Sequence, residues 1–146
     1  MQSSRLLLVV ACAALPCLAQ TAPEALSTTH DGTWSVFLSC DDTQDKYGKV
    51  YGYVYNFPVQ IKGGKLDGRF DETPPPGFIH FAGSVFADGT LHIQADGSTG
   101  NLYATMNRLG PGTPYRYTMR GRLEADRGKA LRIELRPCTA DFKRAQ

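Results

Sequence analysis

The sequence predicts an all-β protein of about eight antiparallel strands, arranged as an up-and-down β-barrel. From Thr33 onward the chain consists of short runs of alternating apolar and polar residues, separated by turn signals, and no segment keeps a helical period. A cysteine ends the first run and another lies near the end of the chain, so a bond between them would bring the first strand beside the last. That contact closes a barrel. A small β-sandwich is the alternative, because the same strands can pack as two open sheets.

Residues 1–19 match a secretory signal peptide, which is removed from a mature protein. Arg5 supplies the positive start, an apolar stretch runs from Leu6 to Leu18, and small residues allow cleavage after Ala19, with cleavage after Thr21 as the alternative. The stretch is too short to cross a bilayer. We therefore expect an exported protein, in the periplasm of a bacterium or secreted, with no transmembrane segment in the mature chain.

Signal removal leaves two cysteines, Cys40 and Cys138. An even number in an exported chain indicates one disulfide, and two buried free thiols are the alternative. Cys12 and Cys17 fall within the signal segment. Lipid attachment there fits less well, because the apolar run before Cys12 is short and Cys17 follows a proline.

The charge of the mature chain is almost balanced. Cleavage removes Arg5 and no acid, so 16 Lys and Arg become 15 against 14 Asp and Glu, a net charge of +1 with neutral histidines. This balance argues against a protein that binds nucleic acid through bulk charge. We expect no nucleic-acid partner and a monomer.

The first strand follows a leader. Residues 20–30 show no periodicity and are predicted to be flexible, and residues 31–146 form the single barrel domain. The run 31–40 alternates as a strand does. Its inner face carries Trp34, Val36, Leu38 and Cys40.

Two hairpins have registers that align their apolar faces. A strand over 49–62 turns at Gly63-Gly64, and strands over 77–86 and 90–96 turn at 87–89 with Gly89 left-handed. The first register pairs Ile61 with Leu66, Val59 with Gly68 and Phe57 with Phe70. The second pairs Val85 with Leu91, Gly83 with Ile93 and Phe81 with Ala95.

A third hairpin is predicted from strands over 115–125 and 129–138, turning at 126–128. Its register pairs Leu123 with Leu131, Gly121 with Ile133 and Met119 with Leu135. A further short strand is expected over 101–107.

The start of the first strand, Gly32-Thr-Trp34, resembles the Gly-x-Trp signature of the calycin barrels, which include lipocalins and avidins. The resemblance implies a calycin-like barrel whose tryptophan plugs the closed end and packs near a basic residue from a late strand. Arg136, Lys143 or Arg144 could supply that residue. No avidin-like ligand site carries over by residue.

The chain also resembles a family of small exported bacterial β proteins without assigned activity. The resemblance covers most of residues 31–144 and rests on three motifs: Asp31-Gly-Thr-Trp-Ser-Val, Pro111-Gly-Thr-Pro-Tyr115 and Glu134-Leu-Arg-Pro-Cys138. It implies export, a β fold and a bond between Cys40 and Cys138. It implies no chemistry.

Aromatic residues on the predicted inner face are candidates for a ligand pocket. Most of them fill a core, because a barrel of eight strands is only just wide enough for its own side chains. Tyrosine hydroxyls need partners when buried, so several at one barrel mouth could hold a small, partly apolar ligand. Gly68 and Gly121, on the same face, could leave room for it. The pocket candidates are Trp34, Tyr53, Tyr55, Tyr115 and Tyr117.

A basic stripe is predicted on the outer face of the last hairpin. In the predicted register Arg120 faces Glu134, while Arg122 faces Arg132. The stripe is a solvated surface or a contact for an anionic envelope component. It consists of Arg116, Arg120, Arg122, Arg132 and Arg136.

No catalytic or metal-binding pattern stands out. His80 and His92 point outward and do not converge, the acidic loop from Asp41 lacks the EF-hand spacing, and no serine lies in a nucleophile elbow. We expect no enzyme, no metal and no cofactor. The function expected is non-catalytic binding of a small molecule at the barrel mouth; a protein-interaction or inhibitor module that uses loops or the arginine stripe is the alternative.

Overall fold

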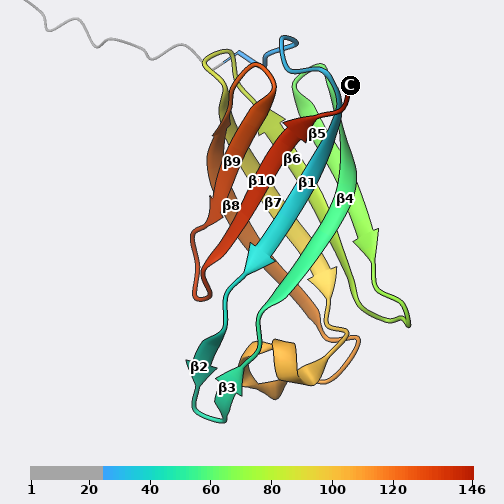
Figure 1. Cartoon of the computed structure of the whole chain (residues 1–146), viewed down its shortest axis with the longest axis vertical. Helices are drawn as coiled ribbons and strands as arrows, with labels where there is room; N and C mark the ends of the chain where they lie inside the picture. Colours follow the sequence, from blue (N-terminus) through green and yellow to red (C-terminus); the bar gives the residue numbers. More distant parts are fainter. Residues whose placement is uncertain (1–24) are drawn as a thin grey trace, which may run out of the picture.

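The computed structural model describes residues 25–146, so the signal peptide expected over 1–19 and the first part of the leader lie outside it. The prediction of an eight-stranded antiparallel barrel is confirmed (Figure 1). The barrel strands are β1 (Gly32–Cys40), β4 (Tyr53–Lys62), β5 (Lys65–Asp71), β6 (Phe78–Val85), β7 (Thr90–Ser98), β8 (Pro114–Leu123), β9 (Arg127–Arg132) and β10 (Cys138–Arg144). A small second sheet pairs β2 (Thr43–Asp45) with β3 (Gly48–Val50).

The barrel closes where β1 lies between β4 and β10. Cys40 and Cys138 are directly opposite in the β1–β10 register, and their sulfur atoms are bonded. The contact between first and last strands that the cysteines predicted is therefore present. It also removes the free strand edges that an open sandwich would expose.

Two of the three predicted hairpin registers are confirmed. The β4–β5 pair places Ile61 opposite Leu66 and Val59 opposite Gly68, and all three predicted β6–β7 pairs are present. The β4–β5 ladder ends at Val59, next to Pro58, which has no N–H to donate. Beyond it Phe57 and Phe70 are not paired, although their rings still pack with centroids 6.2 Å apart.

The third predicted register is wrong by three residues. In the structure Leu123 pairs with Gly128 and Met119 with Arg132, because the turn spans 124–126 and closes through the amide of Glu124. The alternating Leu131, Ile133 and Leu135 looked like a core face but are 54%, 55% and 84% exposed. The inner face of β9 instead carries Ala130, which is fully buried.

Two of the predicted strands are also wrong, one near the end of the chain and one between β7 and β8. The predicted strand over 129–138 is two elements, β9 and β10, joined by a loop at 133–137. The predicted strand over 101–107 is two short 3-10 helices, η1 (Leu102–Ala104) and η2 (Met106–Arg108). Asn101 caps η1, since its side chain accepts from the amide of Tyr103, and this local bond competes with a strand.

The two ends of the barrel differ (Figure 1). One end, called the mouth here, carries the β2–β3 hairpin, the η1–η2 loop, the β5–β6 loop and the β9–β10 loop. The other, called the closed end, carries the three tight turns that connect β4 to β5, β6 to β7 and β8 to β9.

Trp34 fills the closed end. It is fully buried, and its indole N–H donates to the carbonyl of His30 at 2.9 Å. Of the three basic residues considered from the sequence, Arg144 lies over the Trp34 ring, 4.7 Å from its centroid. Arg144 also donates to three backbone carbonyls, those of Thr29, Asp31 and Ala125. Arg144, near the C-terminus, therefore links the start of the domain at Thr29 and Asp31 to the β8–β9 turn at Ala125.

The part of the expected leader that the structure describes packs on the closed end. The Ser27 amide donates to the Val85 carbonyl, Leu26 forms a bridge with Phe86, and His30 is buried. These residues lie along the rim of the closed end, where the backbone of the barrel supplies hydrogen-bond partners for an irregular segment. Such a segment needs no alternation of apolar and polar residues. Residues 25–30 therefore differ from the flexible leader that the sequence predicts.

The bond between Cys40 and Cys138 should contribute strongly to stability. Their separation in sequence is 98 residues, so opening the bond releases a long loop in the unfolded chain. In the chain-entropy account we expect the free energy of unfolding to fall by about 4 kcal/mol. Urea unfolding of the Cys40→Ser, Cys138→Ser double variant against the oxidised protein measures this. Equal midpoints for the two proteins would contradict the expectation.

Candidate functional site

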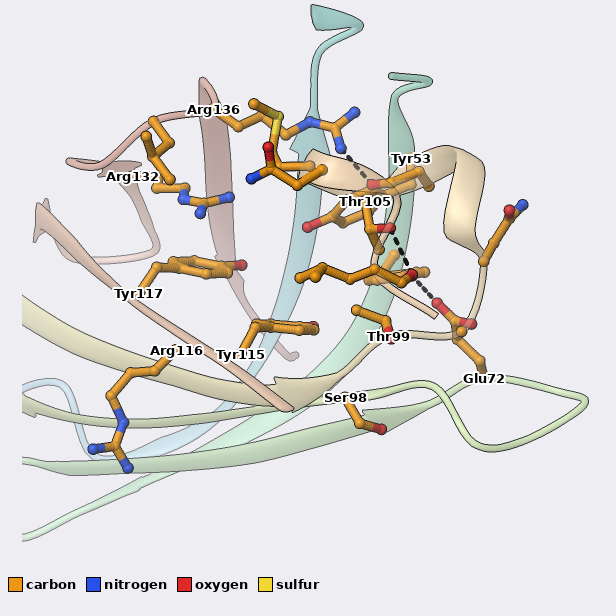
Figure 2. Close-up of a pocket in the computed structure, with 18 residues that line it drawn as sticks. Tyr53, Glu72, Ser98, Thr99, Thr105, Tyr115, Arg116, Tyr117, Arg132 and Arg136 are labelled. Carbon is orange, nitrogen blue, oxygen red and sulfur yellow. Dashed lines mark hydrogen bonds between the residues drawn. The ribbon is translucent and has the colours of Figure 1, made fainter. Parts of the chain in front are cut away.

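A cavity of about 300 Å³ opens at the mouth of the barrel (Figure 2). Its walls come from inward-facing residues of β4, β8 and β9, and from the loops that cover the mouth. The volume is within the range of small-molecule sites. Tyrosine rings and the apolar side chains of Met106, Leu109 and Leu135 make most of the wall surface, and polar side chains of the strands and loops lie among them.

Four of the five aromatic residues selected from the sequence line this cavity: Tyr53, Tyr55, Tyr115 and Tyr117. They converge because Tyr53 and Tyr55 begin β4 while Tyr115 and Tyr117 begin β8, and both strands begin at the mouth. The fifth, Trp34, lies at the closed end and is not part of the cavity.

The cavity does not owe its space to the two glycines considered from the sequence. A Cβ atom at Gly68 would overlap Val59, and one at Gly121 would overlap the Lys129 backbone. Their missing side chains let neighbouring groups approach closely, and neither glycine lines the cavity. The cavity lies at the mouth, beyond the last fully buried side chains of the barrel core.

The four tyrosines keep their protons in the folded protein. Burial is the largest cause that raises the pKa of each phenol. Tyr115 donates to the carbonyl of Phe78 and Tyr55 donates to the carboxylate of Glu72, whereas the buried hydroxyl of Tyr117 has no hydrogen-bond partner among the described residues.

Glu72 enters the cavity from the β5–β6 loop. A Cβ atom at Gly77 or Gly100 would overlap its carboxylate, so both glycines are needed for this position. Its hydrogen bond with Tyr55 also raises the pKa of that phenol further. Glu72 is the one carboxylate among the residues that line the cavity.

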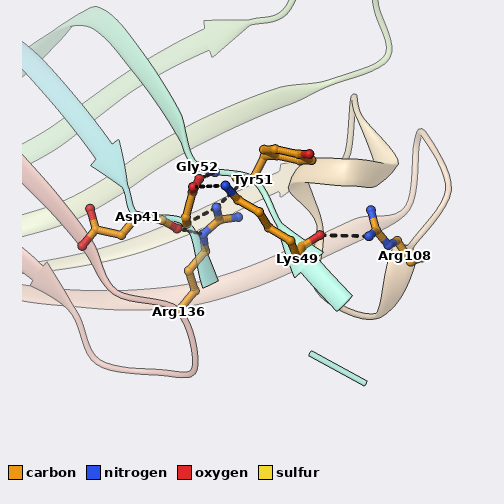
Figure 3. Close-up of polar contacts among 7 residues, drawn as sticks. Asp41, Lys49, Tyr51, Gly52, Arg108 and Arg136 are labelled. Carbon is orange, nitrogen blue, oxygen red and sulfur yellow. Dashed lines mark hydrogen bonds and ion pairs between the residues drawn. The ribbon is translucent and has the colours of Figure 1, made fainter. Parts of the chain in front are cut away.

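Arg136 holds the loops of the mouth together (Figure 3). It is 2% exposed, and its guanidinium donates to the carbonyls of Asp41, Tyr51 and Ala104. These carbonyls belong to three segments: the end of β1, the β3–β4 link and η1. Since all its bonds go to backbone, its charge is not paired with a carboxylate in the described structure.

Further bonds fasten the η1–η2 loop to the β2–β3 hairpin. Arg108 donates to the Lys49 carbonyl at 2.9 Å (Figure 3). The Tyr51 amide donates to the Tyr103 carbonyl at 2.9 Å, and Asp45 accepts from the Asn107 amide at 2.5 Å. Together with Arg136 they make one connected cover over part of the mouth.

Arg132 points into the cavity with few partners. Its guanidinium carbon lies 4.1 Å from the centroid of the Tyr117 ring, in cation–π geometry. Its only recorded hydrogen bond goes to the sulfur of Cys138, at 3.9 Å, and its Nε is buried without a partner among the described residues.

The outer stripe predicted from the sequence therefore loses two of its five members. Arg132 faces inward because the true β8–β9 register reverses the faces of β9, and Arg136 lines the cavity from the β9–β10 loop. Arg116, Arg120 and Arg122 stay exposed on β8. The predicted opposition of Arg120 to Glu134 is also wrong, since Arg120 contacts His92 and Glu134 accepts from Thr118.

The inward arginines could have been found by parity. Cys40 shares the inner face of β1 with Leu38, so its disulfide partner must also face inward, and so must residues an even number of positions before Cys138. That spacing selects Arg136 and Arg132 and conflicts with the register built on Leu131, Ile133 and Leu135, but it also selects Glu134, which is exposed because a loop interrupts the alternation at 133–137. No local signal in the sequence points to Glu72 as part of a cavity.

Within residues 25–146 no three His, Cys, Asp or Glu side chains are close enough to share a metal ion. In the same part of the chain, the structure has no helix with the length and hydropathy needed to cross a membrane. His80 pairs with Asp67 and His92 with Arg120, and neither lines the cavity.

No protein-family model matches the chain, and comparisons with curated proteins and with solved structures give no match. The resemblances to calycins and to small exported bacterial proteins stay predictions. Function must therefore be argued from the cavity itself.

Buried tyrosines should make the protein sensitive to alkali. Because burial raises their pKa above the ordinary value of 10.0, the unfolded chain releases these protons first as the pH rises. Their contribution is complete below pH 10 and is lost above it, at up to about 1.4 kcal/mol per pH unit for each tyrosine. Unfolding free energies from urea titrations at increasing pH should fall less steeply in a Tyr115→Phe, Tyr117→Phe variant. If the free energy of unfolding falls equally steeply with pH in the variant, the pKa values of the two phenols are not raised by folding.

Proposed function

We propose that the protein is a non-catalytic binding protein that holds a small, partly apolar molecule in the mouth cavity. The observation that carries this proposal is the cavity's composition: tyrosine rings and aliphatic side chains surround a few buried polar groups, two of which lack partners. A site of this kind gains affinity from apolar burial and orientation from the polar groups.

The cavity is also supported by fixed structure on all sides. Strands of the closed barrel carry the tyrosines, and Arg136 fastens the covering loops through backbone carbonyls. A preformed site requires little ordering when a ligand enters, which favours affinity. This rigidity is expected of a carrier or receptor domain.

The hydroxyl groups in the cavity favour binding over catalysis. Ser98 donates to the Pro76 carbonyl, Thr99 to the Gly110 carbonyl and Thr105 to the Leu102 carbonyl, so none of these three hydroxyls is hydrogen-bonded to a base. The Tyr55 hydroxyl donates to the Glu72 carboxylate, but the pKa of this phenol is raised, which makes it a poor nucleophile. Neither histidine nor cysteine is among the lining residues. Export to an oxidising compartment is part of the proposal, and the bonded cysteines are compatible with it.

The alternative, an interaction module that uses the outer arginines, has less support. Arg116 is paired with Asp96 and Arg120 with His92, which leaves Arg122 as the one stripe member with no such side-chain bond recorded. The Arg116–Asp96 ion pair contributes little to stability but reduces the charge available to a partner, whereas the contact with His92 leaves the charge of Arg120 unpaired.

A neutral apolar fluorophore, N-phenyl-1-naphthylamine, tests the proposal. We expect its fluorescence to rise on binding to the protein, and we expect binding to weaken at least tenfold in Ala104→Phe, whose new ring would enter the cavity while the backbone carbonyl that Arg136 needs is kept. The matched control is Ala125→Phe, which adds the same ring at an exposed turn of the closed end. Equal binding by Ala104→Phe, or no binding by the unaltered protein, would overturn the proposal.

A further inference from the structure

The cavity has an excess of positive charge that its own residues do not neutralise. Arg132 and Arg136 both present guanidinium groups to it, and neither forms an ion pair with a described carboxylate. Arg116, at the edge, is already paired with Asp96. The one lining carboxylate, Glu72, is bonded to Tyr55.

The two inward arginines differ in how many of their N–H donors are free to bind a ligand. Arg136 uses all three guanidinium nitrogens on backbone carbonyls, so its role is in the architecture of the mouth. Arg132 has a buried Nε without a partner and only a long contact to a sulfur. Arg132 is half-buried, and of its three guanidinium nitrogens only Nε is recorded as buried without an acceptor. A buried N–H without an acceptor reduces stability, unless a ligand supplies one.

A second unpartnered donor belongs to the same place. Tyr117 is 3% exposed, and its hydroxyl has no partner at normal hydrogen-bond distance among the described residues, where the Tyr53 phenol is its polar neighbour. Figure 2 shows this hydroxyl directed to the interior of the cavity, with the Arg132 guanidinium beside the ring of the same tyrosine. The Arg132 charge and the Tyr117 hydroxyl can therefore face one bound group.

We infer that the ligand is an amphipathic organic anion whose single charged group is bound by Arg132 and Tyr117. This inference rests on the proposed function and adds the chemical class of the ligand. A charged acceptor satisfies both donors and neutralises the guanidinium, and such charge-assisted bonds are the strong ones. The apolar part of the ligand lies against Met106, Leu109 and the Tyr115 ring.

Glu72 limits the charge of the ligand to one end. Figure 2 shows Glu72 on the other side of the cavity from Arg132, where its carboxylate would repel a second anionic group. The site therefore favours a monoanion with an apolar body over an anion that is charged at both ends. It also gives the ligand one orientation, with its charge toward the disulfide.

Two probes with the same aromatic rings test the inference. N-phenyl-1-naphthylamine is neutral, and 1-anilinonaphthalene-8-sulfonate is the same molecule with one sulfonate. We expect the sulfonate to bind at least tenfold more tightly, since it forms charge-assisted bonds that the neutral dye cannot form. In Arg132→Met the ratio of the two affinities should fall to about one.

Two further variants complete the design. Arg120→Met removes an arginine from the outer wall and should change neither affinity. Tyr117→Phe keeps the ring under Arg132 and should weaken only the sulfonate, by several-fold. If Arg132→Met does not fold, as judged by its thermal midpoint, the Tyr117→Phe result decides. Arg132→Lys should keep part of the preference for the sulfonate over the neutral dye.

The outcomes separate the two proposals. If both dyes bind equally well, or if the preference persists in Arg132→Met and Tyr117→Phe, the inference is overturned while the proposed function stands. If neither dye binds the unaltered protein, the proposed function falls and the inference falls with it.

Discussion

One buried guanidinium organises the mouth of this barrel. Arg136 donates to backbone carbonyls from the end of β1, from the β3–β4 link and from η1, three segments that share no strand pairing with one another. Buried carbonyls need donors, and no regular ladder reaches these loops. The arginine supplies donors in a fixed planar geometry that lysine lacks. The loops over the mouth are therefore held in place without filling the space beneath them.

The closed end is also held by an arginine that donates to backbone carbonyls, but there the barrel interior is filled. Arg144 also donates to three backbone carbonyls, but beneath it lies Trp34, which fills the barrel completely. At the mouth the tyrosines leave a cavity, and Arg132 is left with donors to spare. Whether an end of the barrel is filled or open thus depends on the side chains under each arginine.

Much of the barrel could be predicted from the sequence, because alternation and turn glycines determine the registers about Gly63-Gly64 and Gly89. The last hairpin could not, since Leu131 and its alternating neighbours imitate a core strand although they face solvent. Four cavity tyrosines were accessible to the same pattern reasoning. The positions of Glu72 and of the covering loops were not, because they depend on contacts between segments distant in the chain, and periodicity carries no information about such contacts.

The central claim is that Arg136 holds the loops that cover the mouth in place, and amide hydrogen exchange tests it most directly. In Arg136→Met the account predicts faster exchange in residues 41–52 and 99–113 together, with protection in β6 and β7 unchanged. The matched variant Arg120→Met should exchange as the unaltered protein does. Retained protection in both loops of Arg136→Met would contradict the claim, and so would a loss of protection spread evenly over the whole barrel.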